Sequence, residues 1–92
     1  FICVGTPLKP DNDLDTSAVF SLAREIPQYV EDYKTVVIKS TVPVGTCAEF
    51  KRMVEERLID TAEIDIVSNP EFMREGSALK DMYEADRIVI GT

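Results

Sequence analysis

Short hydrophobic runs alternate with stretches of helical periodicity along the chain. The runs are rich in Val and Ile and end at polar or turn-forming residues, and they comprise residues 1–4, 35–38, 64–68 and 87–90. Continuous apolar runs of this length are typical of strands that are buried on both faces of a sheet. Apolar residues recur every three or four positions, as in amphipathic helices, over residues 16–30, 43–58 and 77–83.

This order of elements, β-α-β-α-β-α-β, predicts the α/β fold class. Strands that are joined through helices form parallel pairs with right-handed crossovers, and we expect helices on both faces of the sheet. No repeat, low-complexity tract or internal linker divides the chain. Its 92 residues therefore allow one domain at most, with a modest core.

Two prolines affect where the predicted helices begin and end. Pro27 lies inside the first helical pattern, where it lacks an N–H group and clashes with the preceding turn, so we expect a kink or an early end there. Pro43 opens the second helical pattern. It suits the first position of a helix, where an N–H group would have no partner in any case.

The charge and the missing residue types exclude several classes of function. With 10 basic and 17 acidic residues, the net charge is −7, which argues against nucleic acid and against an anionic membrane surface as partners. The absence of His excludes histidine-based triads and His-containing zinc sites. Cys3 and Cys47 are too few for a disulfide framework, and we expect both to be small core residues of a cytoplasmic protein. We find neither a membrane-spanning apolar stretch nor a signal-peptide pattern.

Candidate ligand-binding segments follow the predicted strands. In open parallel sheets, ligands bind beyond the carboxyl ends of the strands. Those places are occupied by Gly5-Thr6-Pro7, Ser40-Thr41-Val42-Pro43 and Asn69-Pro70-Glu71. Each residue taken alone fits an ordinary turn or cap better than a site. Thr41, however, directly precedes the second predicted helix, whose N-terminal dipole favours an anion.

Two carboxylates and one lysine near these segments are further candidates. Glu71 and Glu75 are four residues apart and can face the same side, and a carboxylate at a strand end can act as a general base or hold a water molecule. On spacing alone, two solvated surface acids are the better interpretation. Lys39 could meet a phosphate, although a side chain extended from the sheet edge is the simpler interpretation. Without His or a third nearby carboxylate, we expect no metal site.

The chain contains neither G-x-G-x-x-G nor a P-loop, because its four glycines are scattered. The residue pattern by itself therefore predicts an α/β ligand-binding half-domain.

Three stretches, in their order and spacing, resemble the UDP-glucose/GDP-mannose dehydrogenase family. They are FICVGTP at residues 1–7, VIKSTVPVGT at 37–46 and SNPEFMREGSA at 68–78, and the ending DRIVIG at 86–91 looks like the family's next strand. The resemblance covers essentially the whole chain. Within the family, the motifs look most like those of the UDP-glucose 6-dehydrogenase branch. It implies a Rossmann-like NAD-binding domain, of which this chain would be the second half.

The resemblance also implies a reaction. Members of the family oxidise a nucleotide sugar in two hydride transfers to two NAD molecules in succession, which for UDP-glucose yields UDP-glucuronate. The sugar passes through a thiohemiacetal and a thioester on a cysteine, and water hydrolyses the thioester. Neither Cys3 nor Cys47 stands in the nucleophile's motif, so we expect neither to have that role.

The motifs further imply roles for individual residues. Residues 4–7 (Val4, Gly5, Thr6 and Pro7) would line the NAD site, with Thr6 near the phosphates or ribose. Ser40 and Thr41 would approach the nicotinamide, and Thr41 would also help to hold a catalytic water. Glu71 would be the general base or water activator. The sugar nucleotide would be contacted by Phe72, Met73, Arg74 and Glu75, and Glu75 would also touch the nicotinamide.

The family's glycine fingerprint and its nucleophilic cysteine are missing from this chain, which also lacks an initiator Met. We therefore expect residues 1–92 to be a segment of a longer, homo-oligomeric protein and to be inactive alone. One alternative is a sister enzyme that acts on GDP-mannose or a UDP-amino sugar. Another is a non-catalytic, receiver-like α/β module, which would need acidic residues where this chain has Gly-Thr-Pro and Ser-Thr-Val-Pro.

Overall fold

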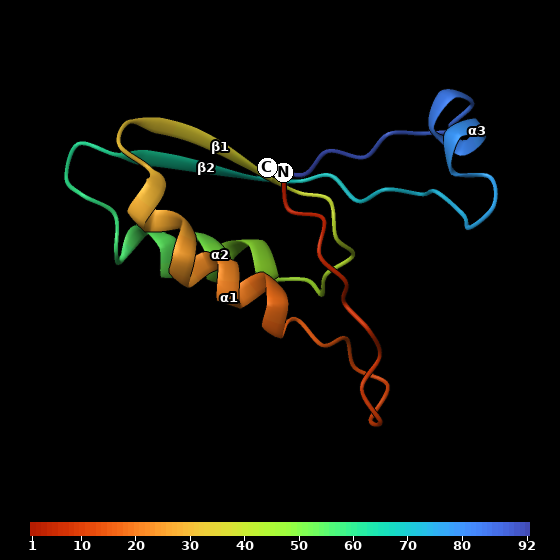
Figure 1. Ribbon diagram of the computed structural model, residues 1–92, viewed down its shortest axis with the longest axis horizontal. Coiled ribbons are helices and arrows are strands. Elements are labelled where there is room, and N and C mark those ends of the chain that lie inside the picture. Colours follow the sequence, from red (N-terminus) through yellow and green to blue (C-terminus); the bar gives the residue numbers. More distant parts are fainter.

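The computed structural model describes all residues from Phe1 to Thr92 (Figure 1). Along the chain, the elements are α1 (Ser17–Glu25), the 3₁₀ turn η1 (Ile26–Tyr29), β1 (Tyr33–Ile38), α2 (Thr46–Glu55), β2 (Glu63–Ser68) and α3 (Ala78–Tyr83). The two strands lie above α1 and α2, and residues 69–92 form a separate arm with α3 at its tip. The α/β class is confirmed.

The sheet consists of two parallel strands, β1 and β2, with Val36 beside Ile66 in the register. Single bridges extend it on either side: Ile2 pairs with Ile38 in parallel, and Gly91 pairs with Ser68 in antiparallel orientation. The predicted strands at residues 1–4 and 87–90 are therefore wrong as strands. The second run finds nothing to bury its side chains against, and Ile88 remains 77% exposed.

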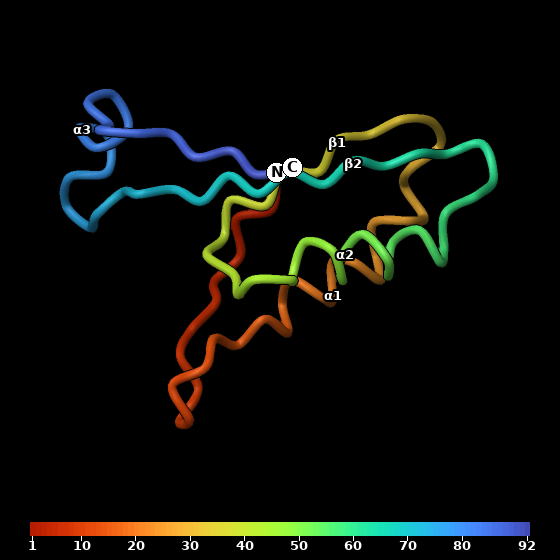
Figure 2. The backbone as a smooth tube through the Cα atoms, turned by 180° about the vertical axis from the view of Figure 1, so that it is seen from behind, coloured from red at the N-terminus to blue at the C-terminus, as the bar shows by residue number.

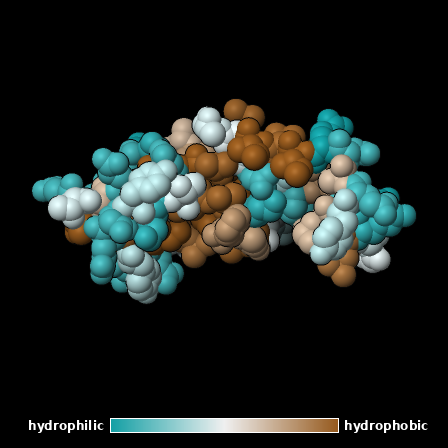
Figure 3. Space-filling model, turned by 90° about the horizontal axis from the view of Figure 1, so that it is seen from above, coloured by the Kyte–Doolittle hydropathy of each residue, from teal (hydrophilic) through white to brown (hydrophobic).

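Both long helices pack on the same face of the sheet, which corrects the prediction that helices cover both faces (Figures 1 and 2). The spatial order Ile2, β1, β2 runs in one direction across the sheet. Successive right-handed crossovers place their helices on one side unless the strand order reverses. The opposite side shows hydrophobic side chains gathered over the middle of the molecule (Figure 3).

The core lies between this sheet and the two helices, as the helical periodicity predicts. Its eight buried members come from both strands, both helices and the N-terminal bridge: Ile2, Val19, Ala23, Val36, Ile38, Phe50, Val54 and Ile64. Cys47 is half-buried against this cluster, whereas Cys3 is exposed, so the prediction of a buried Cys3 is wrong. Ile2 alone of residues 1–4 is buried, because a single bridge places one side chain in the core.

The prolines have different outcomes. The early end at Pro27 is confirmed, since α1 stops at Glu25 and Pro27 continues the chain as a 3₁₀ turn. The predicted helix start at Pro43 is wrong, because α2 begins at Thr46. Gly45 precedes that helix with φ of 91°, a left-handed conformation that glycine adopts without a steric penalty, and the Thr46 N–H donates to the Pro43 carbonyl at 3.2 Å.

Candidate functional site

Four segments meet at the carboxyl ends of β1 and β2, near both termini (Figure 2). They are residues 2–7, residues 39–43, residues 69–71 and the segment that returns to Gly91. This is the edge at which parallel sheets bind ligands, and it is the place that the strand-end residues predict.

The first two segments are joined by hydroxyl groups. Ser40 Oγ donates to the Val4 carbonyl at 2.6 Å, and Thr6 Oγ1 donates to the Thr41 carbonyl at 2.7 Å. The Ile2 carbonyl accepts the backbone N–H of Lys39 at 2.8 Å. Ser40 is 7% exposed, so its hydroxyl is an internal tie. The structure thus brings together the predicted residues Val4, Thr6, Ser40 and Thr41.

Removal of the Ser40 hydroxyl is expected to loosen this junction. Ser40→Ala leaves the Val4 carbonyl without its donor in a partly buried place, so the free energy of unfolding should fall by about 1 kcal/mol. Thr41→Val is the matched control, because Thr41 is exposed and its side chain forms no hydrogen bond; we expect a change within about 0.5 kcal/mol. Urea unfolding measures both values. Equal losses in the two variants would contradict the structural role of Ser40.

The surroundings of these residues suit an anionic ligand. Gly5 is exposed, and a Cβ atom there would meet no atom within 4 Å, so the backbone can be approached closely. Pro7 and Thr41 are also exposed. No acidic side chain is hydrogen-bonded to residues 4–7 or 40–43, and Asp15 is joined to Pro7 through its backbone N–H, which donates to the Pro7 carbonyl at 2.7 Å.

The end of β2 is joined to the end of β1 through Asn69. Lys39 Nζ donates to Asn69 Oδ1 at 2.9 Å, and Asn69 Nδ2 donates to the Val89 carbonyl at 2.8 Å. The interpretation of Lys39 as a lysine extended from the sheet edge is therefore wrong. The sequence reasoning included Asn69 in one of the three candidate ligand-binding segments but gave its side chain no structural role. The sequence feature that could have indicated a structural role for Asn69 is its position between a predicted strand and Pro70.

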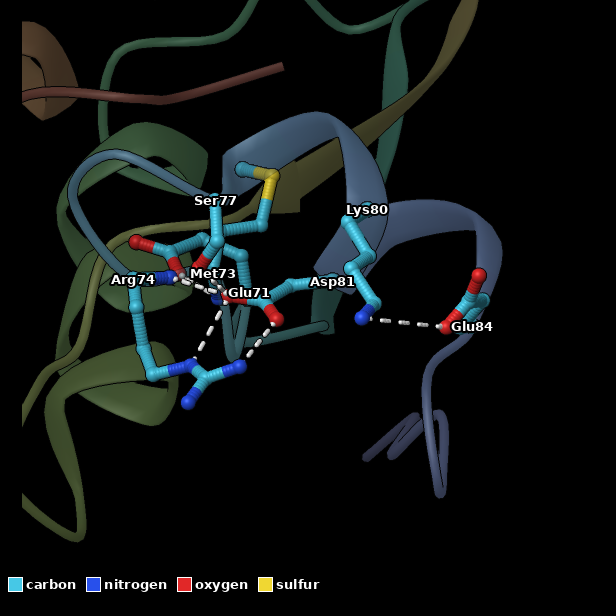
Figure 4. A network of polar contacts seen from close by, with 7 residues as sticks. All are labelled: Glu71, Met73, Arg74, Ser77, Lys80, Asp81 and Glu84. Carbon is cyan, nitrogen blue, oxygen red and sulfur yellow. Dashed lines mark hydrogen bonds and ion pairs between the residues drawn. The ribbon is translucent and has the colours of Figure 1, made fainter.

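Glu71 and the residues after it lie on the arm, and Glu71 and Glu75 form no hydrogen bond with residues 4–7 or 40–43. Residues 71–76 are all exposed, and Glu71 accepts a hydrogen bond at 3.2 Å from the backbone N–H of Met73 (Figure 4). Glu75 forms no hydrogen bond or ion pair, and neither glutamate contacts Thr6, Ser40 or Thr41 through a hydrogen bond. Phe72 and Met73 are exposed as well. The structure shows no hydrogen bond between the two predicted groups of site residues, residues 4–7 with 40–41 and residues 71–75.

Asp81 organises the tip of the arm, and sequence reasoning missed it. The Arg74 guanidinium contacts both carboxylate oxygens of Asp81, at 2.7 and 3.1 Å, and the Arg74 N–H and the Ser77 hydroxyl also donate to Asp81 (Figure 4). These bonds, foremost the side-chain bond from Arg74, hold the pKa of Asp81 well below its usual range, and Asp81 raises the pKa of Arg74.

The ion pair makes the arm sensitive to acid. Because the pKa of Asp81 is lower in the folded state, its stabilising effect is complete above the unfolded value of about 3.9 and is lost as the pH falls through the folded value. We expect the ¹³C resonance of the Asp81 carboxyl to titrate well below pH 3.9, with helical signals of α3 lost in the same range. In Asp81→Asn the arm should lack this transition. A titration midpoint of the Asp81 carboxyl at or above a pH of about 3.9 would contradict its ion pair with Arg74.

Comparison with protein families shows that residues 1–92 match the NAD binding domain of the UDP-glucose/GDP-mannose dehydrogenase family. The chain belongs to this family. It is 46% identical over 92 residues to the UDP-glucose 6-dehydrogenase YwqF of Bacillus subtilis, and 49% identical to the UDP-glucose 6-dehydrogenase of Rhizobium meliloti. These matches include 99% or more of this chain and 21% of each relative, so the chain spans about a fifth of their length.

Solved structures of the dehydrogenase family agree. The UDP-glucose dehydrogenase of Pyrobaculum islandicum superposes with a TM-score of 0.88 at 44% identity, over 99% of this chain and 22% of that protein. The GDP-mannose dehydrogenase of Pseudomonas aeruginosa gives a TM-score of 0.85 at 37% identity, again over 99% and 22%. The predicted resemblance and the Rossmann-like fold class are thus confirmed, and the receiver-like alternative is wrong.

No group of three or more Cys, Asp or Glu side chains is arranged to hold a metal ion. None of the helices combines the length and the apolar character needed to span a bilayer.

Proposed function

We propose that this chain is the second half of the NAD-binding domain of an NAD-dependent UDP-glucose 6-dehydrogenase. The observation that carries the proposal is the match of all 92 residues to the family's NAD binding domain, together with the high identity to two UDP-glucose 6-dehydrogenases. The glycine fingerprint and a sugar-nucleotide domain with the cysteine nucleophile would lie elsewhere in the longer protein. The enzyme would be homo-oligomeric and cytoplasmic.

In this proposal, residues 4–7 and 40–43, which are joined through the Ser40 and Thr6 hydroxyls, would hold NAD. The open backbone at Gly5 supports an anionic ligand, because a bound phosphate could approach backbone N–H groups there, whereas the Ser40 and Thr6 hydroxyls already donate to carbonyl groups of the chain. Val4, Gly5, Thr6 and Pro7 would line the site, and Ser40 would hold the first of these segments against the second. NAD, when bound, accepts hydride from the sugar carbon.

The arm is proposed to face the sugar nucleotide. Eight of its large hydrophobic side chains are exposed: Phe72, Met73, Leu79, Met82, Tyr83, Ile88, Val89 and Ile90. An arm with so little buried surface supports a role at the boundary with other parts of a larger protein. Glu71 would activate the hydrolytic water with Thr41, while Phe72, Met73, Arg74 and Glu75 would contact substrate and Glu75 also the nicotinamide. Asp81 would hold Arg74 in place.

The test is the stoichiometry of the reaction in the full-length protein that contains this chain. Oxidation of an alcohol to a carboxylate removes four electrons, so each UDP-glucose consumed should yield two NADH and one UDP-glucuronate. The 92-residue chain alone should give no NADH, since it lacks the nucleophile. One NADH per sugar, or NADH formation by the isolated chain, would contradict the proposal.

The second candidate function is that of a sister enzyme that oxidises GDP-mannose or a UDP-amino sugar. It is supported by the similarity to the GDP-mannose dehydrogenase of Pseudomonas aeruginosa. Steady-state kcat/KM for UDP-glucose, GDP-mannose and a UDP-amino sugar would separate the two. We expect the value for UDP-glucose to be the largest.

A further inference from the structure

Asn69 is the residue at which three parts of the chain are held together. Its backbone N–H donates to the Ile38 carbonyl at the end of β1 (3.0 Å), and its side-chain oxygen accepts from Lys39 (2.9 Å). Its side-chain nitrogen donates to the Val89 carbonyl on the returning segment (2.8 Å). Because the amide uses both its acceptor and its donor, neither Asp nor Leu can reproduce all of these bonds.

The charged donor at this junction, the Lys39 ammonium group, is bonded to a neutral amide and not to a carboxylate. The Lys39 side chain is half-buried and forms no ion pair with any carboxylate, and its one hydrogen bond within the chain goes to the neutral Asn69 amide. A hydrogen bond from a charged donor is stronger than one between neutral groups, and more so where water is partly excluded. The bond is therefore a substantial link between the two strand ends.

The Lys39–Asn69 hydrogen bond lies close in sequence to Thr41 and Glu71, the two residues proposed to hold and activate the hydrolytic water. Thr41 follows Lys39 by two residues, and Glu71 follows Asn69 by two residues. Pro70 stands between Asn69 and Glu71, where it restricts Asn69 to extended backbone and fixes its own φ angle. Little backbone freedom therefore separates Asn69 from Glu71. Glu71 has only a local bond to the Met73 N–H to hold it otherwise.

We propose that Lys39 and Asn69 are a positioning pair that sets the distance between Thr41 and Glu71 in the thioester-hydrolysis step. The inference rests on the proposed function. In that step the water oxygen bonds to the thioester carbonyl carbon, a water proton passes to Glu71, and the carbon–sulfur bond breaks. The products are the free carboxylic acid and the cysteine thiolate. Lys39 and Asn69 touch none of the reacting atoms and act through the two residues that do.

The experiment compares Lys39→Met, Asn69→Ala and the double variant in the full-length enzyme. Misplacement of a reacting group by about 1 Å can cost about 100-fold in rate, so each single change should lower kcat by about 10- to 100-fold. The KM for NAD should stay within about twofold, and mass spectrometry of the denatured enzyme should show an accumulated covalent adduct. The double variant should be no slower than the slower single variant. Multiplied losses in the double variant, or a raised KM with unchanged kcat, would overturn the pair.

Conservative variants separate positioning from folding. Asn69→Asp keeps an acceptor for Lys39 but loses the donor to Val89, and Lys39→Arg keeps a charged donor; both should retain kcat within about threefold. Lys34→Met, at an exposed lysine paired with Asp32, is the matched control and should leave kcat unchanged. If Lys39→Met lowers the Tm so far that it does not fold, the comparison of Asn69→Asp with Asn69→Ala decides. A loss in Asn69→Asp as large as that in Asn69→Ala would overturn the role of the Lys39 bond.

The outcome for Glu71 distinguishes this inference from the proposed function. An adduct in Glu71→Gln but not in Lys39→Met refutes the positioning pair alone. No adduct in Glu71→Gln refutes the proposed role of Glu71 and the pair with it, whereas the two-NADH stoichiometry tests the overall reaction independently.

Discussion

Glu71→Gln in the full-length enzyme is expected to stop the reaction at the thioester. Glutamine keeps the size of the side chain but cannot take a proton from water. General-base catalysis is worth about 100- to 10,000-fold, so the steady-state rate should fall by at least about 100-fold. In the proposed reaction, both hydride transfers precede hydrolysis. A rapid burst of two NADH per active site should therefore remain, followed by slow turnover.

Two measurements check this result. Stopped-flow absorbance gives the size of the NADH burst, and mass spectrometry of the denatured protein shows whether the sugar nucleotide stays attached. Glu84→Gln is the matched control, since Glu84 is an exposed acid on the same arm whose ion pair with Lys80 spans 3.9 Å. It should have a normal rate and no adduct. A Glu71→Gln enzyme with a normal rate and no adduct would remove Glu71 from the mechanism.

Phe50→Ala should have the largest effect on stability. Phe50, on α2, is fully buried in the core cluster. Truncation of a buried Phe costs about 3–5 kcal/mol, through lost burial and the cavity that remains. The free energy of unfolding of small domains is only about 5–15 kcal/mol, so a loss of this size should leave the variant marginally stable or largely unfolded.

Urea unfolding of the 92-residue chain, followed by far-UV circular dichroism, measures this loss. Phe50→Leu should keep a measurable transition at a smaller cost, because most of the volume is retained. Val44→Ala is the control, since Val44 is fully exposed, and its effect should stay within about 0.5 kcal/mol. A loss below about 1 kcal/mol in Phe50→Ala would contradict the described core.

The local elements were predictable where a residue's own chemistry decides the backbone. The missing N–H of Pro27 ends α1 in any context, and the helical spacing of Val19, Ala23, Phe50 and Val54 marks the faces that are buried. The start of α2 was misplaced at Pro43. Gly45, which directly precedes α2, adopts a left-handed conformation. A helix that started at Pro43 would have to pass through Gly45 in helical conformation, so the helix begins only after it.

The candidate site was predictable in part. Residues at the ends of neighbouring parallel strands must meet at one edge, so the contact of Thr6 with Thr41 and of Val4 with Ser40 follows from the strand order. The bonds of Asn69 to Lys39 and Val89, and of Asp81 to Arg74, could not be derived in this way. They depend on how the arm leaves the sheet and returns to it, and no local pattern encodes that path.

The sequence by itself determined the α/β class, the family and the three segments that carry the candidate site, because periodicity, proline chemistry and motif spacing are properties of short stretches. Only the tertiary structure decided that Ile2 and Gly91 contribute single bridges, that both long helices share one face, and that Glu71 lies on an exposed arm. A hydrophobic run becomes a strand only where a neighbouring strand offers hydrogen bonds and a covered surface. That condition depends on residues distant in the sequence, and here β1 and β2 alone provide it for each other.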